Sequence, residues 1–354
     1  MQAKKWNIFV LAGAGCILLL LSLFTIVIDP FFHFHKPLEF LEYPMKDERY
    51  QNDGIARWFE YDAIITGTSM TQNFKTSEFD EYMGVTSVKI PYAGATFHEL
   101  GRNMRRALEY RPDTRMILCS LDSNYMIWET ETDGYEGVPK YLYDDNPFND
   151  VKYVLNKEVI PKTLAVINYT RAGGKTPTMD EYSFWGDYVT YGREQVLASQ
   201  RVFETANGQS VSLEDTILTG EDKEIIRENC EKNYVQLARD YPETQFIFHI
   251  PPYSIVSWRA AYHNNQVDAE VDKLKYAVEI MLQAENIQVY CFADRLDISD
   301  NLDNYKDSLH YSPEINSEIL RAIAAGEGRL TRENYQEYFE RVRKIYTEYD
   351  YSGL

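Results

Sequence analysis

The sequence predicts an α/β fold in which a mostly parallel sheet lies between two layers of helices, with one membrane-spanning helix in front of it. Short apolar runs that end in polar turns predict the strands, and amphipathic segments that alternate with these runs predict the helices. Such alternation is typical of βαβ units, whose strands pair in parallel. An uncharged apolar run near the N-terminus predicts the membrane helix.

Composition excludes one large class of partner. The chain has 354 residues, of which 44% are hydrophobic and 26% are charged, so it can form a packed core. Its 36 Lys and Arg residues face 55 Asp and Glu residues, which gives a net charge of −19. Proteins that bind nucleic acids use clustered Lys and Arg against the phosphates, so we expect no nucleic-acid partner.

The N-terminal run covers residues 6–28 and contains no charged side chain. At about 1.5 Å per residue, a helix of this length crosses the roughly 30 Å hydrocarbon core of a bilayer. Lys4 and Lys5 precede the run, and Asp29 and Pro30 end it. The positive-inside rule therefore predicts a single-pass anchor with a cytoplasmic N-terminus and an extracytoplasmic body.

Two other interpretations of this run remain as alternatives. A cleaved signal peptide would have a shorter apolar region followed by a small-x-small cleavage site, and no such site follows residue 28. A lipoprotein cysteine at Cys16 would stop the apolar run, yet the run continues beyond it. The remaining cysteines, Cys119, Cys230 and Cys291, have neither a disulfide framework nor metal-ligand spacing. We therefore expect no metal and no organic cofactor.

The body is predicted in three segments, the second of which contains an insertion. Residues 29–58 form a juxtamembrane segment, 59–330 form the α/β domain, and 331–354 form a helix that packs on this domain. An aromatic-rich insertion is expected within the domain at about 123–218. Strands are expected at 62–66, 85–90, 115–121, 245–250 and 287–293, and helices at 96–110, 222–240, 267–285 and 313–325.

Two helix starts have recognisable capping signals. Thr96 and Glu99 have the spacing of a capping box, which satisfies two backbone N–H groups at a helix start. Ser312 followed by Pro313 combines a good N-cap residue with the residue that best tolerates the first helical position.

Candidate catalytic residues follow the predicted strands, where a parallel sheet gathers the side chains that do chemistry. Ser69 ends a Gly-Thr-Ser turn after the first strand, and Asp307 and His310 lie three residues apart before the last helix of the domain. An Asp that orients a His leaves the second imidazole nitrogen free to take a proton from a serine hydroxyl. We therefore expect Ser69 as nucleophile, His310 as general base and acid, and Asp307 as its orienting partner.

An oxyanion hole is expected from groups beside this serine. The backbone N–H groups of Ser69 and Gly94 could stabilise a developing negative charge, since Gly94 lies just after the second strand. Asn124 follows the third strand and could donate its side-chain amide to the same oxygen.

In these residues the sequence resembles the SGNH/GDSL hydrolase superfamily. That family has a serine in a Gly-Asp-Ser block, a glycine after the second strand, an Asn after the third and Asp-x-x-His near the end. Ser69, Gly94 and the pair Asp307 and His310 match in type and order. The first block here is Gly-Thr-Ser, and Asp122 competes with Asn124 for the place of the third-block Asn.

Together with the anchor, the resemblance narrows to the membrane-anchored SGNH-like proteins of bacterial envelope acylation. Examples are those of alginate O-acetylation and of D-alanyl transfer to teichoic acids, which commonly work beside a membrane-bound O-acyltransferase. The resemblance implies a flavodoxin-like sheet and serine-dependent acyl transfer, or ester hydrolysis, on an envelope polysaccharide or polyol. One alternative is a catalytically inactive SGNH-like protein that binds glycan or scaffolds the acyltransferase. Another is a surface-anchored interaction protein.

Substrate contacts are expected from side chains close to these blocks. Flat aromatic faces suit sugar rings, which favours Tyr125 and Trp128 in the insertion and Tyr253 after the fourth strand. His249 ends that strand and is a further candidate, with a core position as the alternative. The insertion's aromatic residues could equally pack a small core of their own.

Overall fold

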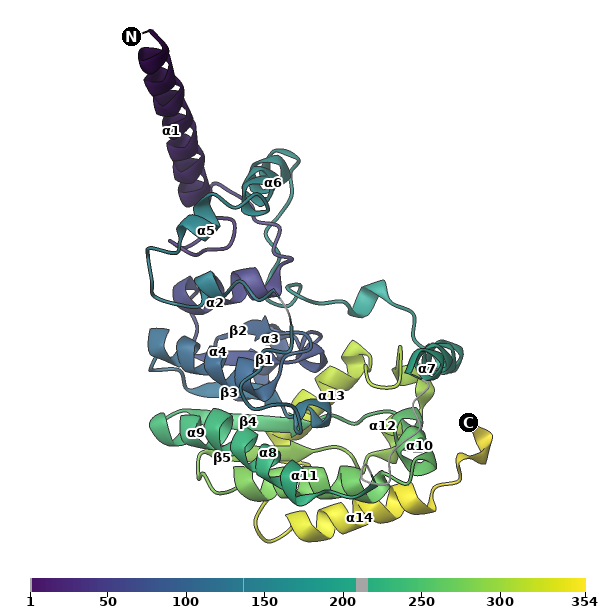
Figure 1. The fold of residues 1–354 in the computed structure, drawn as a ribbon. Coiled ribbons are helices and arrows are strands. Elements are labelled where there is room, and N and C mark those ends of the chain that lie inside the picture. Colours follow the sequence, from purple (N-terminus) through teal and green to yellow (C-terminus); the bar gives the residue numbers. More distant parts are fainter. Residues whose placement is uncertain (1, 136, 208–215) are drawn as a thin grey trace. The chain divides into compact units, whose positions relative to one another are not determined.

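The computed structural model describes residues 2–135, 137–207 and 216–354. The chain divides into two compact units (Figure 1). The first comprises Met1–Phe59 and Gly137–Thr178, and the second comprises Glu60–Glu136 and Met179–Leu354. The segment interpreted as an insertion, about 123–218, is thus shared between them, because residues 137–178 cluster with the N-terminal part of the chain.

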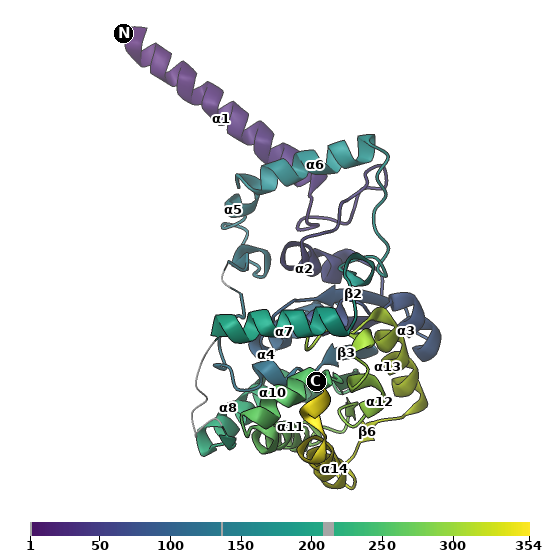
Figure 2. The ribbon, with the colours of Figure 1, turned by 90° about the vertical axis from the view of Figure 1, so that its right-hand side faces the viewer.

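The first unit is helical. It contains α1 (Gln2–Ile28), α2 (Glu48–Trp58), α5 (Val151–Val154) and α6 (Val159–Arg171). Helix α1 is long and apolar enough to cross a membrane, and most of its residues are exposed. Its last turns pack against α5 and α6, which Figure 2 shows beside the end of α1.

A buried carboxylate fixes the chain where it leaves α1. Asp29 accepts hydrogen bonds from the backbone N–H groups of His33, Phe34 and His35, at 2.7–3.1 Å, and from the Tyr153 hydroxyl at 2.7 Å. Burial raises the pKa of Asp29, and these hydrogen bonds oppose that rise. The network ties the end of α1 to α5.

The second unit contains a six-stranded sheet in the order β2-β1-β3-β4-β5-β6. The first five strands in this order pair in parallel, and the last pairs antiparallel with β5. This confirms the predicted mostly parallel α/β fold, although β6 is not among the predicted strands. The strands are β1 (Ala63–Gly67), β2 (Ser87–Pro91), β3 (Met116–Ser120), β4 (Gln245–Ile250), β5 (Ile287–Cys291) and β6 (Arg329–Leu330).

Helices cover both faces of this sheet (Figure 2). On one face α3 packs against α13, and on the other α4, the 220–240 segment and α11 pack together. The helices are α3 (Thr76–Met83), α4 (Phe97–Tyr110), α7 (Arg193–Asn207), α8 (Gly220–Cys230), α9 (Gln236–Asp240), α10 (Ile255–His263), α11 (Val267–Met281), α12 (Leu296–Ser299), α13 (Pro313–Ala325) and α14 (Tyr335–Glu348).

Local details differ from the sequence-based expectations. A π-helical turn at Glu231–Val235 interrupts the predicted 222–240 helix. The Thr96 hydroxyl accepts from the backbone N–H of Glu99 at 3.3 Å, which is one half of the predicted capping box. Ser312 occupies the N-cap of α13 without a side-chain capping bond, so Pro313 provides the start signal.

Helix α14 lies against α11 and buries one stripe of side chains. The indole of Trp258 on α10 stacks on the Tyr346 ring, with centroids 3.9 Å apart. This stack joins α10 to α14. The buried stripe of α14 consists of Tyr335, Tyr338, Phe339, Val342 and Tyr346.

Candidate active site

The turn that carries Ser69 depends on a glycine at the end of β1. Gly67 has a φ of +132°, and a Cβ atom there would lie 2.4 Å from the Ser120 hydroxyl. A larger residue would therefore be strained and would also clash with β3. Beyond it, the Thr68 hydroxyl accepts from the backbone N–H of Met70 and starts a short 3₁₀ turn whose first residue is Ser69.

A small hairpin holds Asp307 and His310. Tyr305 and Tyr311 form an antiparallel bridge, and the backbone N–H of Lys306 donates to the carbonyl of His310 at 3.0 Å. Inside this hairpin the Asp307 carboxylate accepts from the backbone N–H of His310 at 2.8 Å. The positions of the carboxylate and of the imidazole are therefore fixed relative to each other by the backbone.

The structure brings these two residues together with Ser69. The Ser69 hydroxyl lies 2.7 Å from His310 Nε2, and His310 Nδ1 lies 2.8 Å from Asp307 Oδ2. A carboxylate beside Nδ1 selects the tautomer with the proton on Nδ1, which leaves Nε2 as the acceptor for the serine proton. The arrangement is that of a Ser-His-Asp triad.

The electrostatics of Asp307 suit an orienting role. Burial alone would raise the pKa of this carboxyl, but hydrogen bonds from His310 and from two backbone N–H groups bring the pKa below its usual value. Asp307 is therefore ionised at neutral pH and can stabilise an imidazolium on His310.

The two backbone donors expected for an oxyanion hole, the N–H groups of Ser69 and Gly94, follow two paired strands. Gly67, two residues before Ser69, pairs with Pro91, three residues before Gly94, so both groups follow neighbouring strand ends. Gly94 has a φ of +70°, a conformation that favours glycine. Throughout the described residues, no acceptor is found for the backbone N–H of Ser69 or of Gly94. Both N–H groups remain available to an oxyanion.

Asn124, the third expected oxyanion donor, is engaged in a different cluster. Its side-chain amide lies 3.3 Å from the Asp122 carboxylate and 3.4 Å from the Tyr253 hydroxyl. Asp122 also accepts from the Tyr253 hydroxyl and, at 2.7 Å, from Thr68 Oγ1. Of Asp122 and Asn124, Asp122 is thus the one bonded to the turn that contains Ser69.

Trp185, one of the aromatic residues of the insertion, lies against the imidazole of the triad. Its ring meets the His310 imidazole edge to face at 5.7 Å, and its Nε1–H donates to Gln72 Oε1 at 2.8 Å. The Lys306 ammonium lies 3.9 Å from the centroid of the Trp185 ring, and burial lowers the pKa of this lysine. The aromatic richness of the insertion was the available signal, but nothing in the sequence pointed to contact with His310.

The expected substrate-binding residues lie in different environments. Tyr125 and Trp128 contact each other edge to face at 5.3 Å, and Trp128 is 45% exposed. His249 is fully buried against Phe74, and burial lowers its pKa to about 3. His249 therefore lines no accessible surface, and the core alternative describes it correctly. Tyr253 is buried, with its hydroxyl on Asp122.

Neither a search for metal-binding groups nor comparisons with known proteins add to the description of this site. No group of three or more His, Cys, Asp or Glu side chains placed to hold a metal ion occurs among the described residues. Comparisons with protein-family models, with curated proteins and with solved structures gave no match to this chain. What the arrangement can do chemically therefore follows from its own geometry.

Proposed function

We propose that the chain is a serine-dependent acyltransferase or ester hydrolase of SGNH type. It acts outside the cytoplasm on acyl groups of an envelope glycan or polyol, and α1 anchors it in the membrane. The observation that carries this proposal is the relay from Ser69 Oγ through His310 to Asp307, with contacts of 2.7 and 2.8 Å. A serine hydroxyl on the free imidazole nitrogen is the arrangement that activates a nucleophile.

In the proposed reaction, Ser69 Oγ attacks the acyl carbonyl while its proton passes to His310 Nε2. The backbone N–H groups of Ser69 and Gly94 stabilise the tetrahedral oxyanion. The bond from the carbonyl carbon to the alkoxide then breaks, and His310 gives its proton to the alkoxide, which leaves as an alcohol. The acyl group stays on Ser69 as an ester. A second hydroxyl, from water or from an acceptor, loses its proton to His310 as it attacks, and Ser69 regains a proton when it leaves.

The charge distribution supports a membrane location. The unit that contains α1 has 12 basic and 10 acidic residues, whereas the other unit has 24 basic and 45 acidic residues. Their net charges are therefore +2 and −21. Basic residues near a membrane helix are attracted to anionic headgroups, while an acidic body stays in solution. A membrane-bound O-acyltransferase is the proposed protein partner.

A catalytically inactive, glycan-binding scaffold is the second candidate. The engagement of Asn124 with Asp122 and Tyr253 favours it, because this amide is then committed within its own cluster. The two unoccupied backbone donors and the complete Ser-His-Asp relay favour the enzyme.

A fluorophosphonate probe separates the two candidates. An activated serine displaces fluoride from phosphorus and keeps the phosphonyl group as a stable adduct. We expect the full chain in detergent to label, Ser69→Ala to lose labelling, and Ser317→Ala, a control on α13, to label like the native protein. Absence of labelling in the native protein, or equal labelling after Ser69→Ala, would favour the scaffold.

A further inference from the structure

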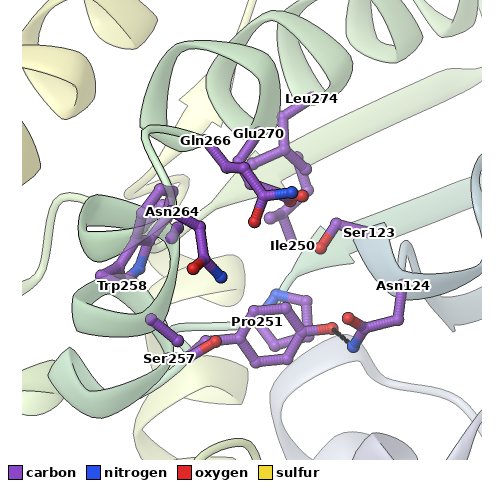
Figure 3. A pocket seen from close by; sticks show the side chains of 14 residues that line it. Ser123, Asn124, Ile250, Pro251, Ser257, Trp258, Asn264, Gln266, Glu270 and Leu274 are labelled. Carbon is purple, nitrogen blue, oxygen red and sulfur yellow. Dashed lines mark hydrogen bonds between the residues drawn. The ribbon is translucent and has the colours of Figure 1, made fainter. Parts of the chain in front are cut away.

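A cavity of about 250 Å³ lies at the carboxyl ends of the central strands (Figure 3). Ser123 and Asn124, which follow β3, line one side, with Pro251 after β4 and Ala293 after β5. Residues of α10, of the connection that follows it and of the first half of α11 line most of the rest. Ligands of open parallel α/β sheets bind at this edge, so the position of the cavity is that of a binding site.

The wall of the cavity combines an apolar surface with uncharged polar groups. Figure 3 shows the polar ends of Ser123, Asn264 and Gln266 facing the same space. The apolar part of the lining comes from Ile250, Pro251, Trp258, Ala260, Ala261, Leu274 and Ala293. A sugar ring has the matching character, with hydroxyl groups at its edge and C–H groups on its faces.

The charges of the lining exclude an anionic ligand. No Lys or Arg side chain belongs to the described lining, and its single carboxylate, Glu270, pairs with Lys273 at 2.8 Å. An anion would lack a cationic partner here and would approach a carboxylate. A purely aliphatic chain is also a poor fit, because it would offer no hydrogen-bond partner to the Asn264 side chain.

The indole of Trp258 lies at the wall of the cavity. The residue is 6% exposed and lines the cavity, and its Nε1–H has no hydrogen-bond partner in the described part of the chain. Because that nitrogen is itself buried, the N–H does not face the space that a ligand would fill, and the proposal does not depend on it.

A hydrogen-bond network connects the cavity to the nucleophile's turn. Asn124 and Tyr253 line the cavity, and both are hydrogen-bonded to Asp122. Asp122 in turn accepts from the hydroxyl of Thr68, the residue that precedes Ser69. A ligand held at the Asn124 end of the cavity would therefore lie beside the cluster that supports the turn of Ser69.

We propose that this cavity is the subsite for an uncharged sugar ring or polyol unit of the acyl acceptor. That the sugar is an acyl acceptor rests on the proposed function. That the cavity binds a neutral sugar is argued from the lining of the cavity alone. The acyl group and the leaving group lie outside this subsite, on the Ser69 side of the Asp122 cluster.

Saturation-transfer NMR on the full chain in detergent tests the inference with two probes, N-acetylglucosamine and glucuronic acid. We expect signal transfer to the ring protons of the neutral sugar, and at least fivefold weaker transfer to the acid. Ala261→Phe fills the cavity and should abolish the transfer. Ala324→Phe, the same change at an exposed position of α13, should leave it unchanged.

Asn264→Ala provides a second, milder variant in case Ala261→Phe does not fold, and it should weaken the signal severalfold. Unchanged transfer in both cavity variants, or equal binding of the acid, would overturn the inference. Fluorophosphonate labelling of the same native sample distinguishes the two proposals. Sugar binding without labelling would contradict the proposed function and support the sugar subsite. Labelling without sugar binding would support the proposed function and contradict the sugar subsite.

Discussion

The Asp307 carboxylate makes more hydrogen bonds than any other group of the triad. It accepts from the His310 imidazole and from the backbone N–H groups of Leu309 and His310. These bonds fix both the tautomer and the orientation of the general base.

Asp307→Asn should impair catalysis while leaving the fold intact. The amide can present its N–H to Nδ1, which would favour the wrong tautomer and leave Nε2 unable to accept the serine proton. We expect ester hydrolysis to fall by roughly 10³-fold to 10⁴-fold, as expected for loss of an orienting Asp. The measurement is hydrolysis of 4-nitrophenyl acetate. Asp303→Asn, an exposed change in the same loop, is the matched control, and equal activity of the two variants would refute the assigned role.

Asp307 also makes stability depend on pH. Its folded pKa lies below the unfolded value of about 3.9, so the ionised form is favoured in the folded state. This contribution is fully present above the unfolded pKa and is lost as pH falls through the folded pKa. Urea unfolding of the native protein and of Asp307→Asn should therefore differ most at pH 7 and converge towards pH 2. A constant difference across this range would contradict the pKa assignment.

At the scale of elements, the strand ends decide where the chemistry lies. Gly67 lets β1 end in a turn that presents Ser69. The turn passes close to β3, because a Cβ atom on Gly67 would lie 2.4 Å from the Ser120 hydroxyl. The strands on either side of β1 are followed by the other two residues, Gly94 after β2 and Asp122 after β3. Each element contributes a short polar turn after a buried strand, and the parallel pairing places these turns at one edge.

Gly67→Ala should therefore destabilise the second unit strongly. Its φ of +132° and the 2.4 Å approach to Ser120 combine backbone strain with a steric clash, for which we expect a loss of about 3 kcal/mol or more. Gly84→Ala is the matched control, because its φ is +64° with nothing within 4 Å, and it should cost only about 1–2 kcal/mol. Urea unfolding gives both values, and similar losses would show that the clash is absent.

The strands and the triad could be predicted because their signals are local. The β1, β2 and β3 runs are apolar and end in turns, and Asp307 and His310 are only three residues apart. Helix α3 escaped prediction because Phe79 and Thr76 are its only buried residues, which leaves no apolar stripe. Strand β6 has two residues, too few for any pattern.

The rest of the site depends on contacts between distant segments. Trp185 donates to Gln72, 113 residues away, and Thr68 donates to Asp122, 54 residues away. No periodicity or motif records such pairs, so the wall beside His310 and the cluster behind Ser69 emerge only from the folded chain. For the same reason, the sequence indicated Asn124 as a candidate site residue but did not indicate its hydrogen-bond partners.

For the whole molecule, the central question is which side of the membrane holds the body. Lys4 and Lys5 before α1, together with the acidic second unit, predict a cytoplasmic N-terminus and an external body. Cysteines Cys119, Cys230 and Cys291 are buried, so an introduced surface cysteine can report the topology.

A membrane-impermeant maleimide applied to intact cells tests this topology. Ser352→Cys, exposed near the C-terminus, should react without permeabilisation, and Lys4→Cys should react only after it. The unmodified chain, whose fourth cysteine, Cys16, lies within α1, serves as the background control. The opposite pattern would place the body in the cytoplasm and would exclude an envelope substrate.

The most direct test of the central claim is to trap the acyl-serine intermediate. The full chain is mixed with 4-nitrophenyl acetate, quenched in acid within the first turnovers, and mapped by peptide mass spectrometry. The triad geometry predicts an acetyl group on Ser69 that is absent in Ser69→Ala and fails to accumulate in His310→Ala. Acetylation confined to lysines, or an equal acetyl-Ser69 signal in His310→Ala, would contradict serine-dependent acyl transfer by this protein.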